Sequence, residues 1–204
     1  MSIFKVIRYT AWTGVAVVGF LGAALVLGWW QVDGARLSTA SQQSGAGQIG
    51  GPFSLVDHQG RPVTEADFRG KPLLVFFGFT NCPEVCPTTL FETSNRLAKL
   101  GAEADKLQVL FISVDPERDT PQQLALYLQS FDKRIVGLTG TVEQVDAAVR
   151  VFKAYAKKVP TDAGYTMDHS SSVYVMDAKG GFRTIIDYHE EEQPALAKIR
   201  MVLR

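Results

Sequence analysis

A stretch of twenty residues without a charge, near the start of the chain, most constrains what the chain can form. It reads AWTGVAVVGFLGAALVLGWW and covers Ala11–Trp30. A helix rises about 1.5 Å per residue, so a helix of this length crosses the roughly 30 Å hydrocarbon core of a membrane. A helix buried in a soluble core is the weaker interpretation, because even such helices usually keep a polar face. We therefore expect residues 11–30 to be a single transmembrane anchor.

The charges around this stretch predict its orientation. Lys5 and Arg8 precede it, whereas only Asp33 and Arg36 follow closely. By the positive-inside rule, residues 1–10 stay in the cytoplasm and the rest of the chain is exported. The chain shows no amphipathic, Arg-rich transit segment, which favours a bacterial inner membrane with a periplasmic C-terminal domain. A mitochondrial inner membrane facing the intermembrane space is the less favoured location.

A cleaved signal peptide is the alternative to an anchor. The apolar region of such a peptide is usually about 7–15 residues, which is shorter than the stretch seen here. Ser38-Thr39-Ala40 would nevertheless serve as a cleavage site. The length of the stretch favours the anchor, and the sequence leaves cleavage open.

The part of the chain after the stretch divides into a linker and a domain. Residues 31–50 are rich in Ser, Gln, Gly and Ala and predict a flexible linker, because they bury too little apolar surface to order themselves. Residues 51–204 are enough for one domain with an ample core. They hold 18 Lys and Arg against 20 Asp and Glu, with no long run of one sign. This balance argues against a nucleic-acid-binding surface.

Both cysteines of the chain lie in one short segment, FFGFTNCPEVCPTTL. Three residues separate Cys82 from Cys86, and a proline follows each of them. An exported domain sits in an oxidising compartment, where a disulfide would persist. A bridge over so short a loop adds little stability, however, and a domain of this size does not need it. A redox couple and two ligands of a metal site are therefore the stronger interpretations.

The apolar pattern around the cysteines predicts the fold. Buried strands, each followed by a helix, are expected at 75–79, 107–114 and 135–138. A closing pair of strands at 172–176 and 182–186 and a last helix at 194–203 complete the domain. The segment FSLVDHQGRPVT predicts an added hairpin around Gln59-Gly60. This order is typical of an α/β thioredoxin-like fold with an N-terminal addition.

The prolines predict where the helix after the first strand begins. A proline inside a helix costs about 3 kcal/mol, and placing Pro87 at the first helical position avoids that cost. Cys86 would then lie at the helix cap and Cys82 in the loop before it. Backbone N–H groups and the positive end of the helix favour thiolates at these positions. The thiolate is the form that both attacks disulfides and binds metals.

A metal site would need a third ligand, and the chain offers three histidines. His58 is expected in a polar hairpin turn and His189 in a charged surface stretch. His169 is expected in the loop that enters the strand beside the cysteine-bearing strand, facing the cysteine loop, and is the favoured ligand. Two thiolates and one imidazole suit Cu(I) and can hold Cu(II), whereas zinc would keep an open fourth position. Copper is favoured, and Met167 is better explained by packing than as a thioether ligand.

Four segments carry a resemblance to a known family: GKPLLVFFGFTNCPEVCPTTL, SVDPERDTPQQL, VGLTGT and MDHSSSVYVMD. From about residue 51 onward the chain resembles the Sco/SenC family of membrane-anchored copper-binding proteins of cytochrome c oxidase assembly. The resemblance implies that Cys82, Cys86 and His169 are copper ligands. It also implies delivery of copper to the CuA centre of oxidase subunit II. A periplasmic copper donor and a thioredoxin-like reductant are the further partners expected.

Several polar residues near the expected ligands have two interpretations each. Asp115 ends a strand at the same sheet edge as the cysteine loop and can tune the site or receive a partner. Asp119 or the residue after it can cap the next helix, and Arg118 can pair locally. Asp168 can orient His169 or simply be solvated.

Two functions follow from these residues. A non-catalytic metallochaperone would hold copper and pass it on by ligand exchange. A thiol–disulfide oxidoreductase would instead use Cys82 and Cys86 to keep the CuA-site cysteines of subunit II reduced for metallation. His169 discriminates between them, because a pure reductase does not need it. A peroxiredoxin is excluded, because its Pro-x-x-x-Thr-x-x-Cys pattern is absent.

Overall fold

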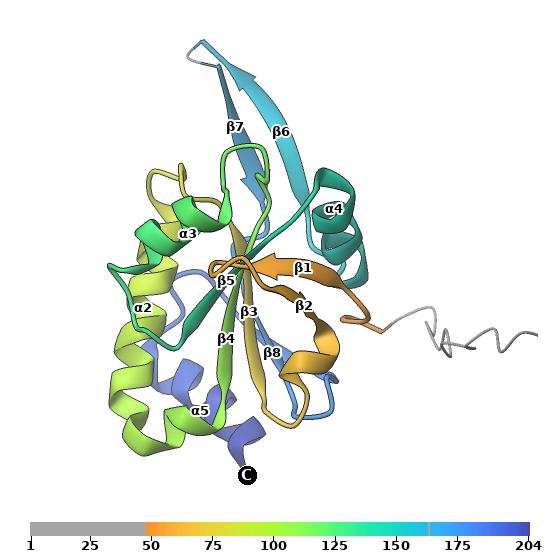
Figure 1. The fold of residues 1–204 in the computed structure, drawn as a ribbon. Helices are drawn as coiled ribbons and strands as arrows, with labels where there is room; N and C mark the ends of the chain where they lie inside the picture. The colour runs from red at the N-terminus through yellow and green to blue at the C-terminus, as the bar shows by residue number, and fades with distance from the viewer. Residues whose placement is uncertain (1–47, 163) are drawn as a thin grey trace, which may run out of the picture. The chain divides into compact units, whose positions relative to one another are not determined.

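In the computed structural model, which describes residues 48–162 and 164–204, seven strands form the central sheet in the order β2-β1-β5-β4-β3-β8-β9 (Figure 1). Their bounds are β1 Ser54–Asp57, β2 Pro62–Thr64, β3 Leu73–Gly78, β4 Gln108–Ser113, β5 Ile135–Thr139, β8 Val173–Met176 and β9 Phe182–Ile186. Strands β3, β4 and β5 are parallel, and β8 runs antiparallel to β3. A parallel centre with an antiparallel closing pair confirms the predicted thioredoxin-like fold.

The predicted anchor, residues 11–30, lies outside the described residues, as does most of the predicted linker. Among residues 48–162 and 164–204, no helix has the length and apolar character needed to cross a membrane. The described residues belong to one unit, Ser44–Arg204. The anchor, its orientation and the boundaries of the linker stay predictions.

Helices pack on both faces of the central sheet. They are α2 Val85–Leu100, α3 Pro121–Leu128, α4 Val142–Val151 and α5 Glu192–Leu203, with two 3-10 helices, η1 Glu65–Phe68 and η2 Gly101–Lys106. Phe76 of β3 packs on Phe111, whose ring contacts Tyr127 of α3. The next residue, Phe77, points the opposite way and packs on Phe152, which follows α4. Strand β3 is therefore buried from both sides, which explains its continuous apolar run.

The ends of the elements follow from local chemistry. The added hairpin is confirmed, because β1 and β2 are antiparallel around a turn in which Gly60 has a φ of 83°. Thr120 caps α3, since its hydroxyl accepts the Gln123 N–H at 3.2 Å. Helix α5 begins at Glu192, two residues before the predicted start at Pro194.

A second, two-stranded sheet was not predicted. It consists of β6 (Ala156–Thr161) and β7 (Gly164–His169), which pair antiparallel. Within the described part of the chain these strands pair only with each other. Figure 1 shows the hairpin extending beyond the end of the main sheet. No backbone ladder therefore ties the hairpin to the main sheet, and contacts that involve side chains join the two.

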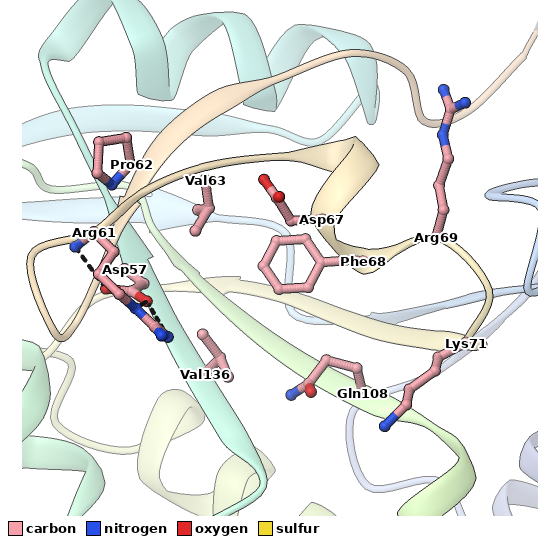
Figure 2. A pocket seen from close by; sticks show the side chains of 10 residues that line it. All are labelled: Asp57, Arg61, Pro62, Val63, Asp67, Phe68, Arg69, Lys71, Gln108 and Val136. Atoms are coloured by element: carbon pink, nitrogen blue, oxygen red, sulfur yellow. Dashed lines mark hydrogen bonds and ion pairs between the residues drawn. The ribbon is translucent and has the colours of Figure 1, made fainter.

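A cavity of about 460 Å³ opens beneath the β1–β2 hairpin (Figure 2). Val63, Phe68 and Val136 point their apolar side chains into it. Each charged side chain around it already bonds to another group of the protein. The cavity lies beside Gln108, at the start of β4, whereas the cysteines follow the end of the parallel strand β3. Neither cysteine lines the cavity.

Candidate metal centre

Both thiols lie where β3 ends and α2 begins. Cys82 is in the connecting loop, and its N–H donates to the Phe79 carbonyl at 3.3 Å. The Cys86 N–H donates to the Cys82 Sγ at 3.4 Å, and the Phe79 N–H donates to the Cys86 Sγ at 3.5 Å. Both are free cysteines. As predicted, backbone N–H groups at a strand end and a helix start therefore point at both sulfurs.

The predicted start of α2 at Pro87 is wrong. The helix begins at Val85, so Cys86 is inside the first turn, not at the cap, and Pro87 is the third helical residue. The first four N–H groups of a helix have no acceptor within the helix, so a proline at this position removes no hydrogen bond. The first bond of this helix runs from the Thr88 N–H to the Glu84 carbonyl at 3.1 Å. The energetic cost that the prediction sought to avoid does not arise here.

The Cys86 sulfur occupies a space left by Gly78, the last residue of β3. A Cβ on this glycine would lie 2.7 Å from the Cys86 Sγ and 2.7 Å from the Cε2 of Phe111. Cys86 is 0% exposed, whereas Cys82 is half-buried. The inner thiol is thus part of the packed core, and the outer thiol can be reached from solvent.

Strand β7 brings His169 to the thiols. The histidine is the last residue of this strand, paired with Ala156, and not in a loop as predicted. Two hydrogen bonds close the hairpin beside it: the Ser170 N–H donates to the Tyr155 carbonyl at 3.0 Å, and the Tyr155 N–H donates to the Ser170 hydroxyl at 2.8 Å. The imidazole meets the Phe79 ring edge-on, with the ring centroids 5.7 Å apart. The strand that follows, β8, lies next to β3 as predicted.

Cys82, Cys86 and His169 converge on one point. Their two Sγ atoms and one ring nitrogen all lie within 4.8 Å of one another, and Nε2 is 3.5 Å from the Cys86 Sγ. The other ring nitrogen, Nδ1, is 2.9 Å from the Ser170 carbonyl. A carbonyl only accepts, so Nδ1 carries a proton and Nε2 is the ring nitrogen that faces the sulfurs. A backbone bond of this kind orients metal-binding histidines in general.

The two thiols differ in acidity. The hydrogen bond from Cys86, helped by the His169 ring and by backbone N–H groups, lowers the pKa of Cys82 to about 3. The same sulfur–sulfur bond, together with burial, raises the pKa of Cys86 above that of an ordinary thiol. Burial lowers the pKa of His169, but the Cys82 sulfur and the Ser170 carbonyl outweigh it, so the pKa lies above its usual value. The metal-free pair is therefore one thiolate and one thiol, and a metal would displace the remaining proton.

Asp119 supports the cysteine loop. Its buried carboxylate accepts three hydrogen bonds: from the Thr80 N–H at 3.0 Å, the Thr80 hydroxyl at 2.6 Å and the Ser113 hydroxyl at 2.6 Å. Burial raises the pKa of this carboxyl group. Asp119 therefore does not cap α3, as one interpretation held, but fixes the loop two residues before Cys82.

Asp115 and Arg118 lie between the main sheet and the hairpin. Arg118 pairs locally with Asp115, as one interpretation predicted, and both residues also bond to Tyr165 of β7. Asp168 is exposed. The Ser170 carbonyl, and not Asp168, orients the imidazole.

The other candidate ligands lie outside the cluster. His58 accepts a hydrogen bond from the Gly137 N–H through its Nδ1 at 3.1 Å. His189 lies 3.3 Å from a carboxylate oxygen of Glu92. Met167 packs against the core, as predicted. Within the described residues, the one group with metal-binding geometry is the Cys–Cys–His cluster.

Sequence reasoning missed three residues that shape the site. Thr80 and Ser170 lie within two residues of a cluster member, and that nearness is a signal that could have identified them. Tyr165 offers no such signal, because its side chain and carbonyl bond to Asp115 and Arg118, which lie 50 and 47 residues away in the sequence.

Comparisons with known proteins identify the family of this chain. Residues 41–204 match the family described as SCO1/SenC. Protein SCO2 homolog, mitochondrial, of Mus musculus is 37% identical over 205 residues, covering 94% of this chain and 78% of that protein. Protein SenC of Rhodobacter capsulatus is 36% identical over 189 residues, covering 92% and 84%. The structure of Bradyrhizobium japonicum ScoI with copper bound is similar with a TM-score of 0.71 and 46% identity, covering 76% of this chain and 99% of that one.

Proposed function

This chain belongs to the SCO1/SenC family, and we propose that it is a membrane-anchored copper metallochaperone. Cys82, Cys86 and His169 hold the copper, and the protein delivers it to the CuA centre of cytochrome c oxidase subunit II. The observation that carries the proposal is the convergence of two sulfurs and one imidazole nitrogen within 4.8 Å. The copper bound in the related ScoI structure supports the choice of metal.

The chemistry of the three donors fits a transferable copper ion. Two thiolates and one imidazole form a soft set of low coordination number that suits Cu(I) and can hold Cu(II). Each donor must be free of its proton to bind, so loading releases the proton of Cys86 and any proton on His169 Nε2. Cys86 is fully buried and Cys82 half-buried. An acceptor thiolate therefore reaches the metal from the Cys82 side, and copper leaves by exchange of one ligand at a time.

The location of the protein is part of the proposal. Residues 11–30 anchor the chain in the inner membrane by a single span, residues 31–50 tether the domain, and the domain acts in the periplasm. The basic residues before the span support this orientation. A reporter that is active only after export, fused after Arg204, should be active, and the protein should stay in membranes after alkaline washing. Recovery of the whole pool as a soluble form starting near residue 41 would contradict the anchor.

His169→Ala tests the proposed function. The substitution removes one ligand from the end of a hairpin, so the fold should survive with a loss of about 1 kcal/mol or less. Copper retention should fall sharply, and oxidase assembly should fail in copper-poor medium but recover with excess copper. His189→Ala is the matched control, because this exposed histidine lies outside the cluster, and it should behave as the wild type. Normal copper binding by His169→Ala would overturn the chaperone proposal.

A second candidate function is supported by the unequal thiols. The low-pKa, accessible Cys82 is suited to attack, and the buried Cys86 is suited to resolve the product. The Cys82 thiolate would attack a disulfide of subunit II, forming a mixed disulfide and releasing one target thiolate. Cys86 would then lose its proton and attack Cys82, which releases the second target thiolate. The chain is left oxidised by two electrons, and a thioredoxin-like reductant must restore it.

The two functions differ in whether they need the His169 imidazole. Disulfide exchange depends on the thiolate fraction and on access, so His169→Ala should retain most of it. Cys82→Ser and Cys86→Ser should abolish either function and cannot distinguish them. Full support of oxidase assembly by His169→Ala in copper-poor medium would favour the reductase.

A further inference from the structure

The hairpin that carries His169 has no backbone ladder to the main sheet, since within the described residues β6 and β7 pair only with each other. Besides the chain connections to α4 and β8, contacts that involve side chains join the hairpin to the main domain. We propose that Arg118 is a positioning residue for His169, acting through Tyr165 and Asp115. The inference rests on the proposed copper site for its functional meaning and on the contacts described here for its geometry.

Three residues, Asp115, Arg118 and Tyr165, form a closed ring of hydrogen bonds between the sheet and the hairpin. The Arg118 Nε donates to the Asp115 Oδ2, and the Arg118 Nη1 donates to the Tyr165 carbonyl at 3.1 Å. The Tyr165 hydroxyl donates to the Asp115 Oδ1 at 2.9 Å, which closes the ring. Both carboxylate oxygens of Asp115 are thereby used, and Tyr165 is held by its backbone and by its side chain. This arrangement fixes the position of β7 at one residue from two directions.

The ring is anchored in the rigid part of the domain. Asp115 is 2% exposed and follows β4 by two residues, and its N–H donates to the Ser113 hydroxyl at 3.0 Å. An exposed ion pair contributes little because water screens it. The Asp115–Arg118 pair differs, because its carboxylate is buried and accepts two bonds, one from Arg118 and one from the Tyr165 hydroxyl. Asp115 thus attaches this ring of hydrogen bonds to the end of β4, and Tyr165 attaches it to the hairpin.

The same guanidinium also lies near Phe79, the aromatic ring on which the His169 imidazole packs. The Arg118 Cζ lies 3.8 Å from the centroid of the Tyr165 ring and 5.8 Å from that of the Phe79 ring. Phe79 in turn packs edge-on against His169, at 5.7 Å and 88°. Tyr165 and His169 are four residues apart in one strand, so their side chains share a face. Arg118 therefore touches both the strand that carries the ligand and the aromatic ring against which the ligand rests.

Lys158 of β6 provides a matched control. Its Nζ lies 3.9 Å from the centroid of the same Tyr165 ring and pairs with Glu117. Both side chains of that pair are about half exposed, and neither bonds to Asp115 or to the Tyr165 carbonyl, although Glu117 accepts a longer bond, 3.3 Å, from the Tyr165 hydroxyl. Lys158→Met removes a cation from the Tyr165 ring and leaves the three bonds among Arg118, Asp115 and Tyr165 in place.

The first test uses the metal-free full-length chain in detergent micelles. Nuclear Overhauser contacts between the Phe79 and His169 rings report the position of the imidazole without any metal. The contacts should be present in the wild type and in Lys158→Met, and lost in Arg118→Met. Arg118→Lys should lose them as well, because an ammonium keeps the charge but lacks the planar fork that bonds two acceptors. Survival of the contacts in Arg118→Met would overturn the inference.

A milder variant covers the case in which Arg118→Met fails to fold. Tyr165→Phe removes the hydroxyl bonds to Asp115 and to the exposed Glu117, and keeps the ring and the backbone carbonyl. The main-sheet amide signals should stay unchanged, while the contacts between the Phe79 and His169 rings should weaken. Unchanged ring contacts in Tyr165→Phe would then decide against the inference.

The second test measures copper. Loss of a group that orients a ligand typically lowers metal affinity by about 10- to 100-fold, and Arg118→Met should show a loss in this range. Its Cu(II) spectrum should shift toward that of His169→Ala, whereas Lys158→Met should match the wild type. Suppose that Arg118→Met loses the contacts between the Phe79 and His169 rings, while both Arg118→Met and His169→Ala bind copper with unchanged affinity. That result would support the positioning role of Arg118 and refute the proposed copper site. A failure of the positioning inference can therefore be distinguished from a failure of the proposed copper site.

Discussion

Cys82 and Cys86 are placed by the central sheet, whereas His169 is placed by a hairpin that lies outside it. The thiol half of the centre consists of a strand end, a short loop and the first turn of α2, with backbone N–H groups directed at both sulfurs. The imidazole half depends on contacts between residues far apart in the sequence, such as Arg118 and Tyr165. A local motif is thus enough to place two of the proposed ligands, but the third proposed ligand, 83 residues after Cys86, needs the tertiary structure.

Oxidation should disable the thiol half completely and is the largest effect we expect. The two sulfurs cannot be bonded to each other and also serve as separate thiolate ligands. Oxidised protein should therefore bind no copper at the centre, and reduction by a dithiol should restore binding. Copper analysis of the oxidised and reduced protein, side by side, checks this. Stoichiometric copper in the oxidised form would place the metal elsewhere, for example at His58 or His189.

Alkylation should reveal the difference between the two thiols within that half. The pKa of Cys82 is lowered to about 3 and that of Cys86 is raised, so between pH 5 and 8 the first is a thiolate and the second a thiol. In reduced, metal-free protein Cys82 should react first, at a rate that hardly changes over this range. An ordinary thiol, with a pKa of about 8.5, would slow by about tenfold per pH unit on acidification.

The measurement is the rate of iodoacetamide labelling at each cysteine, followed by mass spectrometry of the intact protein and its peptides. The urea-unfolded protein is the control, and its labelling should show the ordinary dependence on pH. A steep rise of the Cys82 rate between pH 5 and 8 in the folded protein, or earlier labelling of Cys86, would contradict the account.

A methyl group at Gly78 should disturb the thiol half and leave the hairpin intact. The new Cβ would meet the Cys86 Sγ and the Phe111 ring at 2.7 Å, and overpacking of this kind costs about 1–3 kcal/mol. Gly78→Ala should therefore lower both the free energy of unfolding and copper retention. Gly137→Ala is the matched control, because its Cβ would meet Leu128 at 2.7 Å, away from the thiols. Urea unfolding and copper titration of both variants should show that both are destabilised and that only Gly78→Ala loses copper.

The same contrast explains how much of the molecule could be predicted from its sequence. Strands β3 and β4 are continuous apolar runs, LLVFF and VLFI, and their burial in a parallel centre follows from that composition. The three residues of the cluster could be selected from the sequence because cysteine and histidine are the side chains that soft metals select. The start of α2 was not predictable in this way, since the energetic cost of a proline inside a helix does not apply to the first turn.

The hairpin could not be predicted for a different reason. Most residues of β6 and β7 are partly or fully exposed, so no apolar alternation marks them. Pro160 lies within β6, and a proline in such a run argues against a strand unless the strand is at an edge. What orders this segment is its contact with Asp115 and Arg118, and no local pattern reports a contact over such a sequence distance.

X-ray absorption spectroscopy of the copper-loaded full-length chain tests the central claim most directly, because it identifies the atoms bound to the metal. The account predicts two sulfur ligands and one imidazole nitrogen in the wild type, supplied by Cys82, Cys86 and His169. In His169→Ala the two sulfur ligands should remain and the imidazole signal should disappear, while His189→Ala should match the wild type. A wild-type spectrum without an imidazole ligand, or an imidazole signal that persists in His169→Ala, would contradict the account.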